Sequence, residues 1–108
     1  MMKRTKALAI SPAVKRRVRE RDKGLCVLCG RPGEPVCHFI SRAQGGLGIE
    51  ENVWCGCTDC HRDYDQSPNR YLIRERLAVY FRSKYPEWDK TELIYRKGGQ
   101  YEENTYVV

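Results

Sequence analysis

Two Cys-x-x-Cys pairs, Cys26 with Cys29 and Cys57 with Cys60, constrain the fold of this 108-residue chain more than any other feature. Each pair turns two sulfurs toward one side, and four thiolates complete the tetrahedral shell of a structural Zn²⁺. The 27 residues between Cys29 and Cys57 leave room for a hairpin. The alternative is two reduced pairs without metal. We therefore expect a fold closed around one zinc ion.

The stretch CGCTDC adds Cys55 as a competing ligand close to the second pair. The x-x spacing to Cys60 and the helix expected after it favour Cys57. Cys55 is then a small buried apolar residue. His61 follows Cys60 directly, so it is an alternative zinc ligand as well.

The length and composition of the chain predict a single domain over residues 1–108 whose modest core gains from a metal. Charged residues make up 31% of the chain. No apolar run approaches the roughly 18 residues of a membrane span, and the basic start MMKRTKALAI lacks the apolar run of a secretory signal. We therefore expect a cytoplasmic protein without a membrane partner. In the reducing cytosol, Cys-x-x-Cys pairs hold zinc more often than they form disulfides.

The positive charge is concentrated near the start of the chain. The formal net charge is +6, of which residues 1–31 carry +8 and the other 77 residues −2. A strongly basic end favours a polyanionic partner, and nucleic acid fits best. The alternative is a charged face that only keeps the protein soluble.

A short basic helix is predicted over 12–21. Ser11 is a suitable N-cap and Pro12 fits the first helical position. Val14 and Val18 form a narrow apolar stripe four residues apart. The remaining faces carry basic residues that are candidates for DNA binding, namely Lys15, Arg16 and Arg19.

Two strands and a helix are predicted between the cysteine pairs and just after them. Residues 36–40 favour a strand and residues 53–54 a brief second one. The segment between them is a loop, because three glycines interrupt it: Gly45, Gly46 and Gly48. A helix begins after the second strand, with Thr58 or Asp59 near its cap.

An amphipathic helix is predicted over 68–85, opened by Ser-Pro and stopped near Pro86. Its apolar face is expected to carry Leu72, Ile73, Leu77, Tyr80 and Phe81, with Arg70, Arg74 and Arg82 directed elsewhere. A turn or short helix after it packs Trp88, Leu93 and Ile94 on the core. The polar residues 97–108 are interpreted as a tail.

Between the cysteine pairs lies a second pattern of chemically active residues: His38, Asn52 fourteen residues later, and His61 nine after that. Taken singly, each has an ordinary structural explanation as a satisfied polar side chain or a turn residue. Their joint arrangement is more specific. Strand, glycine loop, strand and helix, with a cysteine pair at either end, resemble the HNH endonuclease family and its α+β, ββα-metal fold.

The resemblance rests on LCVLCG, CHFISRAQGGLGIEENV and CTDCHRDYD, so it covers about residues 20–66. It is closest to small HNH proteins of phages and mobile elements, in which a basic helix precedes the zinc knuckle. The resemblance implies that His38 is the general base, that Asn52 orients it, and that His61 holds a catalytic divalent metal such as Mg²⁺, Mn²⁺, Ni²⁺ or Zn²⁺. Asp65, one turn after His61, is a tentative further ligand.

Two arginines could hold the flanking phosphates, Arg42 just after the first strand and Arg62 beside His61. One residue departs from the family pattern. The position before the base is commonly an Asp or His metal ligand, and here it is Cys37. A thiolate suits Zn²⁺ better than Mg²⁺. Cys37 either ligates zinc with His61, or is a bystander, or marks a weak or inactive site.

These observations give three functions from different classes. The first is a metal-dependent HNH endonuclease that hydrolyses DNA phosphodiesters, encoded by a prophage or mobile element. The second is a zinc-stapled DNA-binding module with weak or no cleavage. The third is a zinc adaptor within a phage packaging or recombination assembly. A homodimer is a further expected partner state, because a double-strand cut needs two active sites or two visits.

Overall fold

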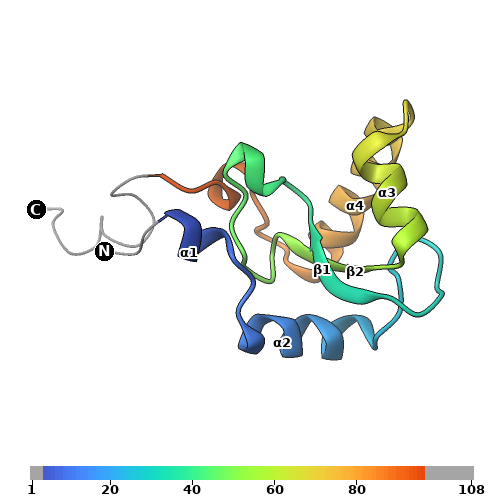
Figure 1. The fold of residues 1–108 in the computed structure, drawn as a ribbon, viewed down its shortest axis with the longest axis horizontal. Coiled ribbons are helices and arrows are strands. Elements are labelled where there is room, and N and C mark those ends of the chain that lie inside the picture. Colours follow the sequence, from blue (N-terminus) through green and yellow to red (C-terminus); the bar gives the residue numbers. More distant parts are fainter. Residues whose placement is uncertain (1–3, 97–108) are drawn as a thin grey trace, which may run out of the picture.

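The computed structural model describes residues 4–96 as a small α+β protein with a two-stranded antiparallel sheet (Figure 1). The predicted tail 97–108 lies outside the described residues. The elements, in chain order, are α1 (Arg4–Leu8), α2 (Pro12–Asp22), β1 (Glu34–His38), the 3-10 turn η1 (Arg42–Gln44), β2 (Val53–Gly56), α3 (Thr58–Gln66), α4 (Arg70–Lys84) and the 3-10 turn η2 (Lys90–Leu93).

The strand pair separates two layers of helices. Figure 1 shows α2 along one side of β1 and β2, with α3 and α4 on the other. Alternation along β2 explains this, because successive side chains of a strand point to opposite faces. Val53 and Cys55 pack with Val14 and Val18 of α2, whereas Trp54 joins the core cluster on the other face.

The predicted helix over 12–21 is confirmed as α2. The Ser11 hydroxyl accepts a hydrogen bond from the Val14 N–H at 3.2 Å, which satisfies one of the free donors of the first turn. The helix ends at Lys23, whose φ of 56° lies in the left-handed region. Val14 and Val18 are buried as expected.

The sheet places the two cysteine pairs and His38 at opposite ends. Glu34 pairs with Gly56 beside the cysteines, and His38 pairs with Val53 at the other end, with a register shift between. The predicted second strand is therefore longer than residues 53–54. The glycine loop between the strands is confirmed, apart from the short turn η1.

The predicted start of α4 is wrong by two residues. Ser67 is the C-cap of α3, so the Ser-Pro dipeptide ends one helix instead of opening the next. The predicted apolar face also needs a correction, because Leu72 is 51% exposed. At about 100° per residue, Leu72 lies about 140° from Leu77 and about 180° from Phe81. The buried face of α4 is that of Leu77 and Phe81.

Arg74 was expected to face away from the core, and this is also wrong. Its guanidinium lies 4.6 Å from the centre of the Phe39 ring and donates to the Tyr64 hydroxyl at 3.3 Å. Its stem and planar head therefore cover the core in the manner of an amphipathic side chain.

The main core is aromatic and forms between β1, α4 and the segment that follows α4. Phe39 meets the Phe81 ring edge-on at 5.8 Å, and Trp88 stacks on Phe81 at 5.5 Å. Three residues predicted to pack here do so: Trp88, Leu93 and Ile94. Among the described residues, no helix is both long and apolar enough to cross a membrane.

Candidate metal centre and imidazole cleft

Four sulfurs gather where the strand pair meets α3. The Sγ atoms of Cys26, Cys29, Cys57 and Cys60 all lie within 4.8 Å of one another; we call them the four-sulfur cluster. Tetrahedral zinc with Zn–S bonds of about 2.3 Å requires sulfurs about 3.8 Å apart. Cys29 Sγ and Cys57 Sγ are 3.7 Å apart. The donor set and its spacing fit Zn²⁺, and within residues 4–96 no other group of three or more such side chains converges.

Backbone geometry preforms this cluster. Gly30 has a φ of 81°, a left-handed conformation that glycine adopts readily, and its N–H donates to the Cys26 carbonyl at 2.9 Å. Cys57 is the N-cap of α3, and its sulfur accepts the Cys60 N–H at 3.4 Å. A reverse turn and a helix start thus aim the two cysteine pairs at one point.

Arg31 lies against the cluster and was not singled out in the sequence. Its guanidinium donates to Cys29 Sγ at 3.4 Å and to Cys57 Sγ at 3.7 Å, and it pairs with Asp59 at 3.4 Å. Hydrogen bonds from the side chain and backbone of Arg31 lower the pKa of Cys29 to about 6, which favours the thiolate that binds metal. Burial raises the pKa of Cys60.

Cys55 lies outside the cluster, on the α2 face of β2. It is fully buried, and burial raises the pKa of its thiol to about 11. It therefore packs as a small apolar residue, as the spacing of the second pair predicted. His61 is likewise not part of the four-sulfur group.

His38 stands at the far end of β1 from the sulfurs and is half-buried. Its Nε2 lies 3.0 Å from the carbonyl oxygen of Leu8. Because a carbonyl oxygen only accepts, Nε2 carries the proton, and Nδ1 keeps its lone pair in the neutral ring. Burial lowers the pKa of His38 below its ordinary 6.5; the hydrogen bond to Leu8 acts in the opposite direction, and the positive charge of Arg42 adds to the lowering.

A cavity of about 320 Å³ opens beside this imidazole. We call it the imidazole cleft; it is lined by Ala9, Ile10, Lys15, Val36, His38 and Arg42. One wall comes from the segment before α2 and the first turn of α2, the other from β1 and the start of η1. Two cations beside a neutral base make this cleft suitable for a phosphate group.

Asn52 is fully buried and ties the glycine loop to the end of β1. Its Oδ1 accepts the Ile40 N–H at 2.8 Å, and its Nδ2 donates to the carbonyls of Ile40 at 3.1 Å and Leu47 at 2.8 Å. Its backbone carbonyl also accepts the Phe39 N–H at 2.7 Å. Asn52 thereby fixes the two residues that follow His38.

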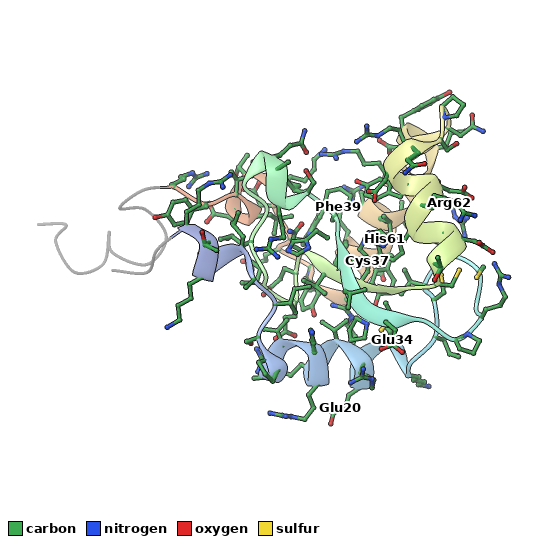
Figure 2. All side chains as sticks on the ribbon, viewed as in Figure 1. Glu20, Glu34, Cys37, Phe39, His61 and Arg62 are labelled. Carbon is green, nitrogen blue, oxygen red and sulfur yellow. The ribbon has the colours of Figure 1, made fainter. Side chains whose placement is uncertain are left out.

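His61 and Asp65 lie one turn apart on α3, with His61 Nε2 3.6 Å from Asp65 Oδ2. Both are partly exposed. Figure 2 shows His61 on the side of α3 that faces the strands, where its ring lies 6.3 Å from that of Trp54. The two donors are close enough to share one cation, but His61 does not line the imidazole cleft.

Cys37 is fully buried and belongs to the core cluster with Trp54, its partner in the sheet register. Burial raises the pKa of its thiol. His38, the next residue, has its side chain on the opposite face of β1, as strand alternation requires. Cys37 therefore lies where a packing residue lies. Its sulfur could bind a metal as a thiolate only after the core around it opened.

Of the five basic residues predicted to bind DNA, Lys15 and Arg42 line the imidazole cleft and the other three do not. Arg19 pairs with Glu34 at 3.1 Å, and Arg62 pairs with Asp59 at 2.9 Å on the outer side of α3 (Figure 2). Arg16 is exposed on α2.

Two contacts around His38 and Asn52 have no signal in the sequence. The Leu8 carbonyl that holds His38 left no signal, because a backbone carbonyl is the same in every residue. Arg21, the last residue of the predicted basic helix, belongs to no pattern that marks a structural role. It is mostly buried and donates to the carbonyls of Glu50 and Val53 at 2.7 Å each, on either side of Asn52.

Comparison with known proteins gives a partial relative. No protein-family model matches the chain. The chain is 32% identical over 78 residues to the Type IV methyl-directed restriction enzyme EcoKMcrA of Escherichia coli (strain K12). The match covers 63% of this chain and only 28% of that protein. This chain is thus similar to a limited part of a restriction enzyme and carries a four-cysteine cluster that could hold zinc.

Proposed function

We propose that this protein is a metal-dependent DNA endonuclease of the HNH type. The observation that carries the proposal is the imidazole cleft, in which a neutral, oriented His38 faces a cavity bordered by Lys15 and Arg42. Similarity to part of a restriction enzyme supports DNA as the substrate. The four-sulfur cluster supports the zinc-braced scaffold of that family.

His38 acts as the general base in this proposal. With Nε2–H donated to the Leu8 carbonyl, Nδ1 is the atom that accepts a proton from the attacking water. The lowered pKa of His38 keeps the ring neutral at physiological pH. Asn52 orients the base indirectly, through its three hydrogen bonds to the loop that follows it.

Lys15 and Arg42 bind the phosphate whose bond is cleaved. Both line the cleft, and a guanidinium can hold two phosphate oxygens at once. Arg16, Arg19 and Arg62 then contact flanking phosphates, the latter two only after exchanging their carboxylate partners. The affinity of such a surface falls steeply with salt.

His61 and Asp65 would hold the catalytic divalent metal, whose role when bound is to neutralise charge on the phosphate and leaving oxygen. Their donor atoms are 3.6 Å apart, which suits two ligands of one ion. Water and phosphate oxygens complete the shell, because Cys37 is buried in the core. We assign Cys37 to packing and do not extend the proposal to a homodimer or to phage packaging or recombination proteins.

A second candidate is a zinc-stapled DNA-binding module that cleaves weakly or not at all. The observation in its favour is that α3 offers one imidazole and one carboxylate, and neither lines the imidazole cleft. A site with two protein donors holds a metal less firmly than one with three. Binding by itself does not need a fixed neutral imidazole, which is why we prefer the endonuclease.

The experiment that tests the proposal compares nicking of supercoiled plasmid by the wild-type protein and by His38→Ala, with Mg²⁺, Mn²⁺, Ni²⁺ or Zn²⁺ supplied. Loss of a general base is expected to reduce the rate about 10²- to 10⁴-fold. Zinc content, thermal unfolding and DNA retention should stay near wild type, because His38 contacts neither the sulfurs nor the aromatic core. Gln66→Ala is the control, because Gln66 is exposed at the end of α3 and lines neither cavity, and it should keep wild-type nicking activity.

Undiminished nicking by His38→Ala would exclude this residue as the base. If no metal supports nicking by the wild type while retention of DNA is salt-sensitive, the binding module is the correct function. If DNA is not retained even at low salt, both candidates fail and the zinc adaptor is left.

A further inference from the structure

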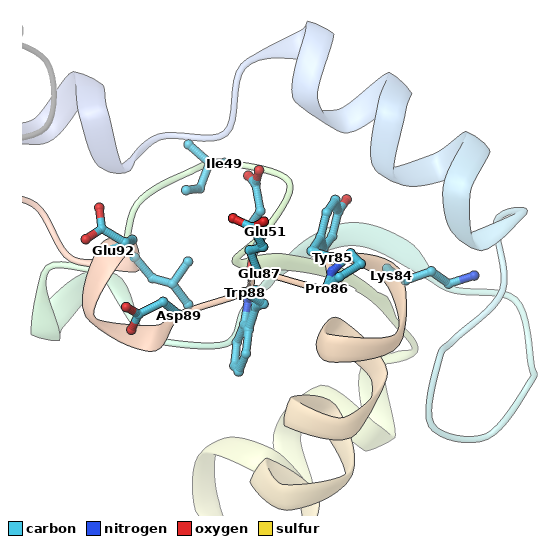
Figure 3. Close-up of a pocket in the computed structure, with 10 residues that line it drawn as sticks. Ile49, Glu51, Lys84, Tyr85, Pro86, Glu87, Trp88, Asp89 and Glu92 are labelled. Atoms are coloured by element: carbon cyan, nitrogen blue, oxygen red, sulfur yellow. Dashed lines mark hydrogen bonds between the residues drawn. The ribbon is translucent and has the colours of Figure 1, made fainter.

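A second cavity of about 400 Å³ lies between the end of α4 and η2, and it shares no lining residue with the imidazole cleft (Figure 3). Its floor is apolar, formed by Ile49, Tyr85, Pro86, Trp88 and Leu93. Carboxylates border it, from Glu51, Glu87, Asp89 and Glu92. We call this cavity the acid-rimmed pocket. Nothing in the proposed cleavage reaction uses it.

The floor of this pocket is held rigidly. The Trp88 indole N–H donates to the Glu51 carbonyl at 2.8 Å, and its ring stacks on Phe81 with an angle of 6° between the planes. The Tyr85 hydroxyl is held by Arg21 at 3.1 Å and by Glu50 at 3.0 Å. An apolar guest would therefore enter a preformed site and order few side chains on binding.

The rim carries negative charge that is partly compensated only at Asp89, which is near the positive charge of Arg96. Within residues 4–96, the carboxylates of Glu51, Glu87 and Glu92 make no hydrogen bond or ion pair. Asp89 caps η2 through Thr91. The one lysine at the pocket does not neutralise them: Figure 3 shows the Lys84 side chain extending away from the carboxylates, and its Nζ lies 5.8 Å from the centre of the Tyr80 ring.

The sign of this charge selects the class of partner. The chain as a whole carries +6, so a pocket with four carboxylates is an exception on its surface. DNA would be repelled from the rim, and acidic proteins as well. A positively charged segment with an apolar side chain matches both the rim and the floor.

We propose that the acid-rimmed pocket docks a basic peptide segment of another protein, with one apolar side chain against Trp88 and Tyr85 and with flanking lysines or arginines at the carboxylates. This surface is separate from the imidazole cleft, so a protein could be held there while DNA is bound. The inference does not depend on whether the protein cleaves DNA.

The probe is a displayed library of random 12-residue peptides, selected on the wild-type protein and counter-selected on Glu51→Gln, Glu87→Gln, Glu92→Gln. This triple variant keeps the shape of the rim and removes three charges. The matched control, Glu20→Gln, Asp63→Asn, Glu75→Gln, removes three charges from exposed residues elsewhere. Thermal unfolding confirms that both variants are folded, and NMR titration of a selected peptide against ¹⁵N-labelled protein locates its binding site.

We expect selected peptides to contain an apolar residue flanked by Lys or Arg and to shift the Trp88 indole signal. The triple variant should bind them at least 10-fold more weakly and the control within about 2-fold of wild type. Enrichment of neutral or acidic peptides, or equal loss in both variants, would overturn the proposal. So would a dimer in sedimentation that only the triple variant abolishes, or tighter peptide binding by a protein ending at Arg96, because these would give the pocket to a second copy or to residues 97–108.

Discussion

The two ends of the β1–β2 strand pair carry different kinds of site. At the Glu34–Gly56 end, four cysteines from two short local motifs converge on one point and face one another. At the His38–Val53 end, an imidazole faces a cavity whose walls come from segments far apart in the sequence. The first end is closed around its own donors, and the second is open to a ligand.

In the proposed function, this contrast separates the source of stability from the source of reactivity. The four sulfurs lie at the spacing of a tetrahedral zinc site. A metal held by four thiolates has no free position for a substrate. His38 has one nitrogen held by Leu8 and the other without a hydrogen bond among the described residues. The proposed function therefore assigns the closed end to holding the fold and the open end to the chemistry. If the two ends are independent, a substitution at one end leaves the other unchanged.

The largest effect is expected from Cys26→Ser, which removes one thiolate from the closed end. Zinc binding by four thiolates contributes about 10 kcal/mol or more, comparable with the whole stability of a domain of this size. We expect loss of bound zinc and of cooperative unfolding, measured by metal analysis and circular dichroism. Nicking should disappear as a consequence.

Cys55→Ala is the matched control for that variant. Cys55 lies two residues from Cys57 but packs on α2 and is not one of the four clustered sulfurs. Its loss should cost about 1 kcal/mol and leave one zinc bound. Full zinc content in Cys26→Ser would mean that three cysteines suffice and that the closed end is not the staple of this fold.

The closed end and most of the elements could be predicted from the sequence because their signals are local. Cys-x-x-Cys spacing, the Ser11-Pro12 helix start and the glycine loop each depend on neighbouring residues, and the structure agrees with all three. Leu72 departs from the predicted apolar face because the apolar residues of α4 spread around the helix, so a single face does not hold them all.

The open end could be predicted only in part. Resemblance pointed to His38, Asn52 and His61, but not to the segment that orients His38 through the Leu8 carbonyl or to Arg21 beside Asn52. These contacts join residues 29 or more positions apart and involve backbone atoms. The acid-rimmed pocket is likewise made by the Ile49–Glu51 loop meeting residues 84–93. No local sequence pattern predicts such long-range contacts.

Asn52→Ala should have the next largest effect, since it acts on the open end from inside the fold. It leaves the Ile40 N–H and the carbonyls of Ile40 and Leu47 without partners in a buried site. Unsatisfied groups of this kind cost about 1 to 3 kcal/mol each, so we expect a loss of about 3 kcal/mol in denaturant unfolding. Zinc should remain bound.

The matched control is Asn69→Ala, because Asn69 is exposed and its side chain makes no capping bond to α4. It should change the free energy of unfolding by less than about 0.5 kcal/mol. If Asn52→Ala instead loses its zinc, the two ends are coupled through the loop, and their separation is incorrect.

The pH dependence of nicking distinguishes the ends through His38. A general base works only when it is neutral, and burial, with Arg42 nearby, lowers the pKa of His38 below 6.5. The acidic limb of the profile should therefore have its midpoint below pH 6.5, with activity falling about tenfold per pH unit below that lowered pKa. The measurement is kcat/KM against pH, with unfolding followed in parallel. An acidic limb centred above pH 7 would mean that another group limits the reaction.

The smallest effect is expected from Lys15→Ala, which changes only the border of the imidazole cleft. Removing one phosphate contact should weaken DNA binding several-fold and lower the slope of log affinity against log salt by about 1. Lys90→Ala removes the same charge from an exposed position on η2, outside the residues that line the cleft, and should leave that slope nearly unchanged. Fluorescence anisotropy with a labelled duplex at several salt concentrations measures both. Equal changes in the two variants would show that DNA responds to overall charge, and the open end would then lack a defined phosphate position.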